Sequence, residues 1–528
     1  MRRTAIFGWG LVAPRSANID EFAHNLDQAQ SWLTPFDGFG PDNFLVGEPK
    51  FDFVDYAPWL EERFPPSRFR QLTDKMDPTS LYAIGSFIQA LGQNPGVEGA
   101  LRELGAQAHV YVGNALGAYP TVYRTSLEYY RAQRRWNRFW AAPERNAELR
   151  AHLAAPGSVP FLDPALVGDA DDREAAEDAW FAFWAARSDE LRQYLKELAE
   201  IEGQRVEGDV ESGKLKVIRD KRRRLAQLQE KWATPEPPWG QVSANLLWNI
   251  PNTPASQISM LGKITGFAFA PIAACSTFSV SLKLALDAID RGEAKLVVVG
   301  SADPPPNPLT VGAFYGARVL SADGDLSKPL SGLKGTHVAG GACIWIVGDL
   351  EYGLSKGWKP LGLEPVSVGV SADADHIITP SSEGPRAAMH QALRRAETPT
   401  TAIASWDLHA TATPGDYQEV ENLQTVVPKN VLVTARKGTF GHGMGVGGGW
   451  ELTAQYLGCA RGRLFPTLLS ETEVHESIAA LGQQLVYDRP VELPRAAVGK
   501  LSMGVGGINA CVISRPWDAR TTGSNEKG

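Results

Sequence analysis

One cysteine and two histidines stand out as residues whose surroundings could support covalent chemistry. Cys275 lies in the run Pro271-Ile-Ala-Ala-Cys-Ser276, between a short strand signal and the start of an amphipathic helix. A thiol in that position is close to the positive end of the helix and its free N–H groups, which favour the thiolate. A thiolate is the nucleophile that attacks a thioester. The alternative is a buried, unreactive cysteine, a common role for this residue type.

The two histidines lie in segments rich in small residues. His409 is part of Asp407-Leu-His-Ala-Thr-Ala-Thr-Pro-Gly-Asp416, directly after a strand-like run over 401–406. His442 ends Lys437-Gly-Thr-Phe-Gly-His442, and a glycine-rich stretch up to Glu451 follows it. Small neighbours leave room for an imidazole to face a cavity. A single histidine of this kind is more often structural than catalytic, so the hypothesis of a site depends on all three residues together.

The elements that must position these residues follow an alternating pattern of strand and helix signals. This alternation predicts a layered α/β architecture. The predicted strands cover 3–7, 109–112, 267–271, 295–300, 342–347, 431–434 and 511–514, and the predicted helices cover 19–26, 78–91 and 276–291.

Residues 119–240 differ in character from the segments on either side. The stretch is rich in Arg, Glu, Ala and Trp, and its pattern predicts long helices over 123–140, 174–201 and 214–232. Strands and glycine-rich turns resume on both sides of it, so we interpret it as a helical insertion. The last residues, 516–528, are predicted to form a tail.

Composition excludes several classes of protein. A chain of 528 residues with 43% hydrophobic residues can bury a large core, and its length predicts more than one domain. Its net charge of −8 does not mark it as nucleic-acid binding. The four cysteines lie far apart without a CxxC pair, which favours reduced thiols over disulfides or a zinc site. No apolar stretch reaches the roughly 20 residues that cross a bilayer. We therefore expect a cytoplasmic protein with no membrane span, no nucleic-acid partner, no metal and no other cofactor.

The ordered cysteine and histidine motifs resemble those of β-ketoacyl-acyl-carrier-protein synthases, the condensing enzymes of fatty-acid and polyketide synthesis. Cys275 matches their Ala-Cys-Ser turn, and His409 matches their His-Gly-Thr-x-Thr-Pro-x-Gly-Asp motif. Lys437, His442 and Glu451 match the Lys-x-x-x-Gly-His segment and its glutamate at the family's own spacing. The resemblance covers almost everything outside the insertion and the final residues.

The chain also departs from the family pattern. The run Gly504-Val-Gly-Gly-Ile-Asn509 resembles the family's Gly-Phe-Gly-Gly-Thr-Asn turn, but Met503 and Val505 stand where aromatic residues are expected. Ala410 replaces the first glycine of the histidine motif, and Pro329-Leu-Ser331 replaces a Pro-Phe-Asp run. Every catalytic side chain of the family is present, so these changes bear on substrate choice and gating more than on the chemistry.

The resemblance implies a thiolase-like five-layer α-β-α-β-α core made from two related halves. The N-terminal half covers 1–350 and holds the helical insertion at about 119–240, the C-terminal half covers 351–515, and 516–528 are the tail. It also implies a homodimer whose partner is acyl carrier protein in its acyl-loaded and malonyl-loaded forms.

The activity implied is decarboxylative Claisen condensation through a Cys275 acyl-enzyme. Backbone N–H groups of Cys275 and Val505 form the oxyanion hole in this scheme, and neutral His409 and His442 donate to the enolate. Lys437 keeps His442 oriented and neutral.

The remaining site residues have substrate-binding or supporting roles in the same scheme. Thr411 and Thr413 bind the pantetheine arm, and Met503 and Val505 complete the substrate surface. Glu451 orients the Lys437–His442 region, and Asp416 is a second supporting carboxylate. A helix-surface carboxylate is the alternative for Glu451.

Three other functions fit parts of the sequence. An acyltransferase or malonyl decarboxylase of the same fold would use Cys275 without condensing, and a non-catalytic chain-length partner would keep only the fold. Gly443-x-Gly445-x-x-Gly448 fits a dinucleotide-binding fingerprint, but these glycines come several residues after the strand, so the oxidoreductase hypothesis fits poorly.

The insertion concentrates positive charge on a chain that is acidic overall. Acyl carrier proteins are acidic, so we expect the insertion to cap the active-site entrance and to contribute to carrier docking. The alternative is a helical ornament whose aromatic residues pack inward and whose arginines are solvated. The residues concerned are Arg131, Arg134, Arg135, Arg138 and the run 214–224, with Tyr129, Tyr130, Trp136, Phe139 and Trp140 interleaved.

Overall fold

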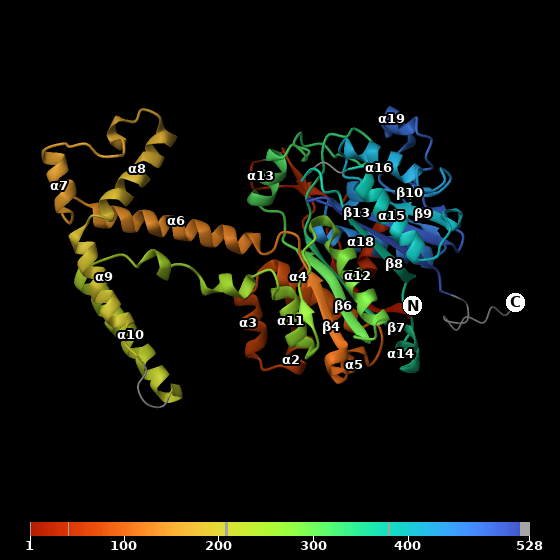
Figure 1. The fold of residues 1–528 in the computed structure, drawn as a ribbon, viewed down its shortest axis with the longest axis horizontal. Coiled ribbons are helices and arrows are strands. Elements are labelled where there is room, and N and C mark those ends of the chain that lie inside the picture. The colour runs from red at the N-terminus through yellow and green to blue at the C-terminus, as the bar shows by residue number, and fades with distance from the viewer. Residues whose placement is uncertain (1, 41, 206–209, 378–380, 518–528) are drawn as a thin grey trace. The chain divides into compact units, whose positions relative to one another are not determined.

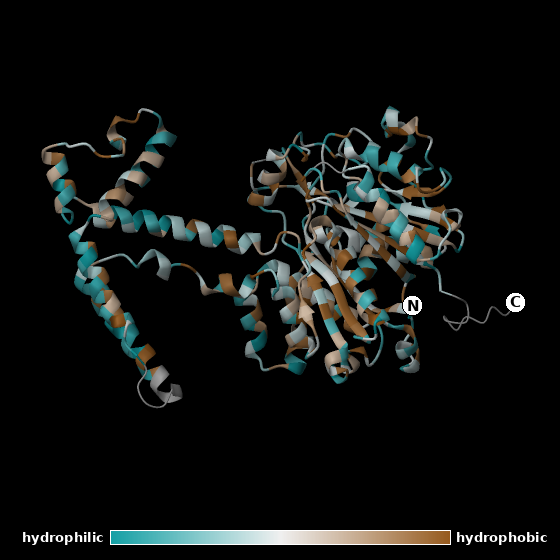
Figure 2. Ribbon diagram, in the orientation of Figure 1, coloured by the Kyte–Doolittle hydropathy of each residue, from teal (hydrophilic) through white to brown (hydrophobic). Residues whose placement is uncertain are grey.

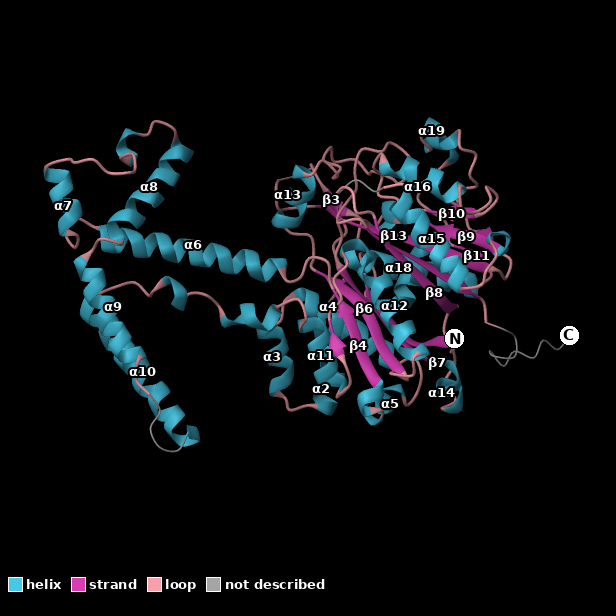
Figure 3. Cartoon of the chain, in the orientation of Figure 1, coloured by secondary structure: helices cyan, strands magenta, loops and turns pink. Residues whose placement is uncertain are grey.

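A computed structural model of the chain describes residues 2–40, 42–205, 210–377 and 381–517, and its contacts divide into two compact units (Figure 1). The main unit comprises 1–121 and 247–528, and the inserted unit comprises 122–246. Figure 3 shows that the described strands belong to the main unit and that the inserted unit is helical.

Two five-stranded sheets form the frame of the main unit. The first has the order β1 (Thr4–Val12), β7 (Gly341–Asp349), β6 (Leu296–Asp303), β4 (Ala108–Gly113) and β5 (Ala268–Phe269). The second has the order β8 (Glu364–Ala372), β14 (Ile508–Arg515), β13 (Ala497–Gly504), β9 (Ile403–Asp407) and β10 (Leu432–Thr434).

The two sheets repeat one topology. Numbered by their appearance in the chain, the strands of each sheet lie in the order 1-5-4-2-3. In each sheet the first two pairings are antiparallel and the last two are parallel. All strands of the first sheet precede residue 350, and all strands of the second follow it.

The strands of the first sheet are buried along their length, except for the half-buried edge strand β5. β1, β6 and β7 are buried at every position, and in Figure 2 this sheet is largely coloured as hydrophobic. A strand with both faces covered is expected to be a continuous apolar run. Helices must therefore lie on both faces of the sheet.

Helices supply the other three layers. Between the sheets lie α12 (Thr277–Asp290) and α18 (Met444–Ala460), which contact strands of both. α4 (Pro78–Leu91) and α11 (Thr253–Gly262) cover the outer face of the first sheet, and α15 (Glu383–Arg395) covers that of the second. This is the five-layer thiolase-like arrangement, so the predicted fold class is confirmed.

Glycines allow the central helices to approach closely. A Cβ at Gly449 of α18 would lie 2.6 Å from the ring of Phe278 on α12, and one at Gly448 would lie 2.9 Å from the hydroxyl of Ser502. The glycine run after His442 is therefore a packing surface inside a helix, and not a phosphate-binding loop.

Shorter elements complete the main unit. Its other helices are α1 (Ile19–Leu26), α2 (Ala57–Arg63), α3 (Ser67–Lys75), α5 (Val97–Glu103), α13 (Pro308–Gly316), α14 (Leu350–Ser355), α16 (Gly415–Gln424), α17 (Lys437–Phe440) and α19 (Glu476–Ala479). Two small strand pairs join β2 (Thr34–Pro35) to β3 (Leu45–Val46) and β11 (Arg463–Leu464) to β12 (Val491–Glu492).

The end of the chain is ordered further than predicted. Trp517 is buried, and the guanidinium of Arg3 lies 5.8 Å from the centre of its ring. Residues 518–528, the rest of the predicted tail, lie outside the described residues. None of the helices in the described ranges is long and apolar enough to cross a membrane.

The inserted unit is a set of helices around a tryptophan-rich core. Its helices are α6 (Tyr119–Ala141), α7 (Ala147–Ala154), α8 (Ala170–Ala185), α9 (Asp189–Glu202) and α10 (Val210–Trp232). Trp136, Trp140, Trp180, Trp184 and Tyr194 are buried together.

The prediction of one helix over 174–201 is wrong, because α8 ends at Ala185 and α9 begins at Asp189, after Ser188. The hydroxyl of Ser188 caps α9 by accepting the N–H of Leu191 at 3.2 Å. The side chain of Asn146 binds the carbonyl of Trp184 at 2.7 Å, near the end of α8. The Ser-Asp-Glu run at 188–190 is a helix-start signal that the apolar pattern concealed.

Some of the positive charge expected on the insertion is paired within it. Arg134 lies 2.6 Å from Asp178 and Arg138 lies 2.6 Å from Glu177, both carboxylates of α8. Trp136 and Trp140 are buried, as the ornament alternative expects. Arg131 and Arg135 are exposed.

Asp77 joins the two segments of the main unit that flank the insertion. Its carboxylate accepts the hydroxyl of Thr121 at 2.7 Å, at the entry to the insertion. Its N–H donates to the side chain of Asn249 at 2.6 Å, just after the exit. Asn249 also donates to the carbonyl of Lys75 at 2.7 Å, so one buried cluster fixes the two junctions.

Candidate active site

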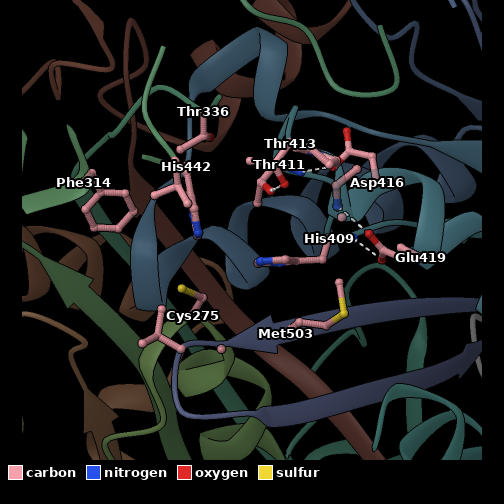
Figure 4. A pocket seen from close by; sticks show the side chains of 16 residues that line it. Cys275, Phe314, Thr336, His409, Thr411, Thr413, Asp416, Glu419, His442 and Met503 are labelled. Atoms are coloured by element: carbon pink, nitrogen blue, oxygen red, sulfur yellow. Dashed lines mark hydrogen bonds between the residues drawn. The ribbon is translucent and has the colours of Figure 1, made fainter. Parts of the chain in front are cut away.

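A cavity of about 300 Å³ opens where the central helices begin, and it contains every predicted site residue whose side chain was expected to meet substrate (Figure 4). Cys275, His409 and His442 line it, and so do Thr411, Thr413, Met503 and Val505. In Figure 4 the nitrogen-bearing edges of both imidazoles point toward the sulfur of Cys275.

A strained turn presents Cys275. The residue lies in a short 3₁₀ turn, Ala274–Ser276, immediately before α12, and Ala274 has a φ of 48°. Such left-handed backbone is unfavourable for an alanine and persists only where the surroundings impose it. Ser276 donates to the carbonyl of Ile508 at 2.8 Å, and Thr277 donates to the carbonyl of Ala274 at 2.7 Å.

The electrostatic environment of Cys275 differs from the prediction. Burial raises the pKa of the thiol to about 11, while the backbone N–H of Val505 and the ammonium of Lys437 act in the opposite direction. The expectation that the helix start makes the thiolate the favoured form is therefore wrong, because desolvation outweighs it. The predicted oxyanion hole of the Cys275 and Val505 N–H groups stays a prediction, and Val505 lines the same cavity as Cys275.

Glu419, on α16, fixes the backbone around His409. Its carboxylate accepts the N–H of His409 and the N–H of Ala410, each at 2.7 Å. Burial raises the pKa of Glu419 to about 7, against the effect of these hydrogen bonds. Glu419 was not predicted, although its spacing of three from Asp416 at a helix start is a usable signal.

Asp416 ties the rest of the same loop together. Its carboxylate accepts the N–H of Thr411 at 2.8 Å, of Ala412 at 3.1 Å and of Leu330 at 2.9 Å. Burial raises its pKa to about 6. The contact to Leu330 is through the backbone, so the substitution of the family's Pro-Phe-Asp run leaves it intact.

Both imidazoles have their proton position fixed by neighbours. The Nδ1 atom of His442 accepts the N–H of Met444 at 3.2 Å, and Nδ1 of His409 lies 3.4 Å from the Lys437 ammonium. Burial holds the pKa of each histidine well below its ordinary range, and the positive charge of Lys437 acts in the same direction. Each ring is thus neutral, and because Nδ1 accepts, Nε2 carries the hydrogen and is free to donate.

Lys437 contacts a different histidine from the one predicted. Its ammonium donates to the carbonyl of His409 and lies beside that ring, and it makes no recorded contact with the ring of His442 within the described residues. Its other partner is Glu451, at 2.6 Å. Its charge still lowers the pKa of His442 through space.

Glu451 is a fully buried carboxylate and not a residue of a helix surface. It lies on α18 between two ammonium groups, Lys437 at 2.6 Å and Lys500 at 2.8 Å. Lys500, on β13, was not predicted. A lysine inside a buried strand has no motif of its own, and only the packing of α18 against the second sheet brings it here.

The remaining walls of the cavity are less polar. Phe314, Val319 and Thr336 line one side and come from segments without a chemical motif, so the sequence did not identify them. Met503 and Val505 line the same cavity, and Val505 is 48% exposed. Within the described part of the chain, no cluster of three or more His, Cys, Asp or Glu residues could hold a metal ion.

The fold and the cavity, with one cysteine and two neutral histidines, place this protein in the class of enzymes with a thiolase-like fold. Comparison with known proteins indicates the family. The N-terminal domain of β-ketoacyl synthases matches residues 224–350, and their C-terminal domain matches residues 364–471. Parts of both halves of the chain thus match the two domain models of the β-ketoacyl synthase family.

Relatives and solved structures agree with this family. The chain is 27% identical over 280 residues to the 3-oxoacyl-[acyl-carrier-protein] synthase 2 of Staphylococcus aureus, an alignment that covers 51% of this chain and 66% of the relative. The synthase of the same name from Vibrio harveyi is 28% identical over 277 residues, which cover 50% of this chain and 65% of that one. The alignments thus span somewhat less than two thirds of these relatives.

The fold is shared by more distant ketosynthases. The ishigamide ketosynthase/chain length factor superimposes with a TM-score of 0.69 at 19% identity, covering 98% of this chain and 100% of the other. A β-ketoacyl synthase from Burkholderia phymatum superimposes with a TM-score of 0.67 at 18% identity, with the same coverage.

Proposed function

We propose that this chain is a β-ketoacyl-acyl-carrier-protein synthase of fatty-acid or polyketide (including polyene) biosynthesis. It condenses an acyl thioester with a malonyl thioester through an acyl group carried on Cys275. The observation that carries this proposal is the set of two neutral imidazoles, His409 and His442, whose free N–H edges face the Cys275 sulfur across one cavity.

The first step transfers the acyl group to the enzyme. The sulfur of Cys275 attacks the acyl carbonyl, the bond to the pantetheine sulfur breaks, and the thiol proton passes to that leaving sulfur. Backbone N–H groups of Cys275 and Val505 bind the oxygen on which negative charge develops. Burial raises the pKa of the free thiol to about 11, so the attack depends on stabilising the charge that develops on the substrate oxygen.

The second step forms the new carbon–carbon bond. The malonyl carboxylate leaves as CO₂, and its bonding electron pair moves toward the thioester oxygen as an enolate. His409 and His442 stabilise that oxygen by donating from Nε2. The enolate carbon then attacks the acyl carbonyl on Cys275, the carbon–sulfur bond breaks, and the Cys275 sulfur takes up a proton.

Residues at the cavity mouth fit recognition of the carrier arm. The hydroxyls of Thr411 and Thr413 lie 3.0 Å apart on the loop that Asp416 holds, where they can bind the amides of pantetheine. Met503 and Val505 line the same cavity and contact the acyl chain. Asp416, Glu419 and Glu451 position the loop and the lysine rather than touch substrate.

Acyl carrier protein is the proposed partner. The relatives from Staphylococcus aureus and Vibrio harveyi are named for it, and one structural neighbour is a type II PKS acyl-carrier protein in complex with its ketosynthase, at 15% identity and a TM-score of 0.64. We include the basic residues of the inserted unit in this docking proposal. Arg222 is exposed and Arg224 half-buried on α10, whereas Arg134 and Arg138 are paired with α8.

We also propose a homodimer and a division of the main unit into halves at 1–350 and 351–515. The repeated strand order supports the halves. The edge strand β5 supports the dimer, since Phe267 and Ile272 beside it are 58% and 57% exposed. An exposed edge with apolar neighbours favours pairing with a second copy. A monomer by light scattering at micromolar concentration would contradict this arrangement.

A second candidate function keeps the acyl-enzyme but not the condensation. The small, half-exposed Val505 stands where the family has an aromatic residue, so the two acyl partners could be held less tightly than in a synthase. Such an enzyme would transfer acyl groups or release CO₂ without forming a β-ketoacyl thioester.

Product analysis distinguishes the two functions. The enzyme is incubated with a panel of acyl-carrier thioesters, and its intact mass is measured before malonyl carrier is added. A synthase gains the acyl mass and then forms the β-ketoacyl carrier. Acyl gain with CO₂ release and no β-ketoacyl product identifies the second function.

A further inference from the structure

A second buried lysine lies behind the histidines and is used by no step described above. Lys500 is on β13 directly opposite Asp407 of the parallel strand β9, and both side chains are completely buried. Its ammonium lies 2.8 Å from Glu451 and 3.8 Å from Asp407.

Glu451 joins this lysine to the one that contacts His409. One carboxylate oxygen of Glu451 lies 2.6 Å from Lys437, and the other lies 2.8 Å from Lys500. Removing charges from water costs several kcal/mol per ion, and apolar residues of the same size often stabilise a fold equally well. A buried bridge of two lysines and one glutamate is therefore better explained by a role in the site than by stability alone.

The two lysines together fix the chain at His409. Lys437 donates to the carbonyl of His409 and lies 3.4 Å from its Nδ1 atom. Lys500 donates to the carbonyl of the preceding residue, Leu408, at 3.3 Å, and to the carbonyl of Leu501. The backbone on which His409 sits is thus held from one side by Glu419 and from the other by two ammonium groups.

Charged and titratable groups lie near the imidazoles on several of the elements that pack around them. They are Lys437 (α17), Arg436 just before it, Glu451 (α18), Lys500 (β13), Asp407 (β9), Asp416 and Glu419 (α16), Asp303 (β6) and the Cys275 thiol. Among these groups, Lys437 and Lys500 are the two whose charge lowers the pKa of both His409 and His442. Arg436 pairs with Asp407 at 2.9 Å, and this carboxylate offsets its charge.

Protonation of His409 would disrupt this arrangement. The added proton would lie on Nδ1, which faces the Lys437 ammonium at 3.4 Å. Two donors would then face each other, and the ring could not keep its position.

We propose that Lys500 is a positioning residue for the decarboxylation step. By binding Glu451 and the Leu408 carbonyl it keeps Lys437 and His409 in their relative positions. The inference rests on the proposed function, since it assigns Lys500 to the enolate-stabilising half of that reaction and not to acylation of Cys275.

Two variants separate the two parts of this role, and a third is a matched control. Lys500→Met removes the charge and the hydrogen bonds, whereas Lys500→Gln removes the charge and keeps a donor. Arg436→Met removes a buried cation of the same cluster whose charge Asp407 offsets. Circular dichroism and thermal melting confirm that each variant is folded. If Lys500→Met does not fold, Lys500→Gln provides the test.

The measurements are acylation of Cys275 by intact mass and CO₂ release from malonyl carrier between about pH 5 and 8. We expect Lys500→Met to acylate at nearly the wild-type rate. It should release CO₂ about tenfold more slowly at neutral pH, as is typical when a residue that orients a functional histidine is lost. Removing a nearby cation raises the pKa of the histidines. As the pH is lowered, both Lys500 variants should therefore lose activity at a higher pH than the wild type does. Lys500→Gln should lose less activity at neutral pH, and Arg436→Met should keep the wild-type acid limb.

Histidine ring NMR on the same proteins makes the outcome independent of activity, with signals assigned from His409→Gln and His442→Gln. At least one of the two rings should begin to titrate at higher pH in both Lys500 variants than in wild type. Unchanged ring titration and CO₂ release in both variants would overturn the role of Lys500, and so would an equal shift in Arg436→Met. A wild-type enzyme that releases no CO₂ would contradict the proposed function, and the ring titration would still decide the effect of Lys500.

Discussion

The two units of this chain differ in which residues they bury. The main unit completely buries the bridge of Lys437, Glu451 and Lys500 behind its histidines. The inserted unit buries tryptophans and keeps ion pairs such as Arg138–Glu177 partly exposed to solvent. Breaking a buried pair leaves an uncompensated charge, whereas exposed pairs contribute little. The main unit also has exposed ion pairs, such as Lys50–Glu21, so the contrast concerns the buried bridge alone, to which we assign a role in the proposed chemistry.

Removing one carboxylate from each unit tests this contrast with the largest expected effect. Glu451→Ala leaves two buried ammonium groups without their shared partner, so it should lower the free energy of unfolding by about 3–5 kcal/mol. Glu177→Ala, the matched change in the inserted unit, should cost less than about 1 kcal/mol. Urea titrations followed by circular dichroism measure both. Similar losses in the two variants would remove the distinction between the units.

The histidines come next in expected effect. His409→Ala and His442→Ala should each acylate Cys275 normally and lose roughly a hundredfold or more in malonyl decarboxylation, because each removes one donor worth on the order of 3 kcal/mol to the enolate. Acyl transfer makes no use of these donors. Acylation is measured by intact mass and decarboxylation by CO₂ release. Unchanged decarboxylation in either variant would show that the ring does not bind the enolate.

The smallest effect is expected for the surface of the inserted unit. Reversing Arg222, Arg223 and Arg224 to Glu should raise the apparent KM for carrier-linked substrate several-fold at low salt, with little change for a small thioester. Electrostatic docking acts on association and is weakened by salt, so the difference should shrink as salt is added. Steady-state kinetics with both substrates measure it. An equal effect on both substrates, or none on either, would leave α10 without a role in docking.

Local patterns in the sequence were sufficient to predict a layered α/β fold, and the family resemblance supplied the thiolase-like arrangement and the predicted site residues that line the cavity. Helices over 19–26 and 78–91 match α1 and α4, because the apolar periodicity and the caps Asn18 and Asp77 are local signals. The motif around Cys275 and both histidines is equally local. The first strand extends to Val12, beyond the predicted 3–7, because Gly10 lets α4 pack against it: a Cβ there would lie 2.1 Å from the carbonyl of Ser86.

Contacts between distant segments could not be predicted in this way. Lys500 meets Asp407 through the pairing of two parallel strands, and no local pattern encodes that register. Lys437 contacts His409 and not His442, although His442 is nearer in the sequence. The helical turn α17 separates Lys437 from His442. The pKa of Cys275 likewise depends on how completely the surrounding layers bury it, which a helix-start signal does not reveal.

The central claim is that Cys275 carries the acyl chain that the malonyl unit extends. The most direct test gives wild type and Cys275→Ala the same acyl carrier and then malonyl carrier, following protein mass and product together. Wild type should gain one acyl mass, lose it when malonyl carrier is added, and form the β-ketoacyl carrier, whereas folded Cys275→Ala should gain no mass and form no product. Acyl gain at another residue of the variant, with β-ketoacyl product still formed, would contradict the account.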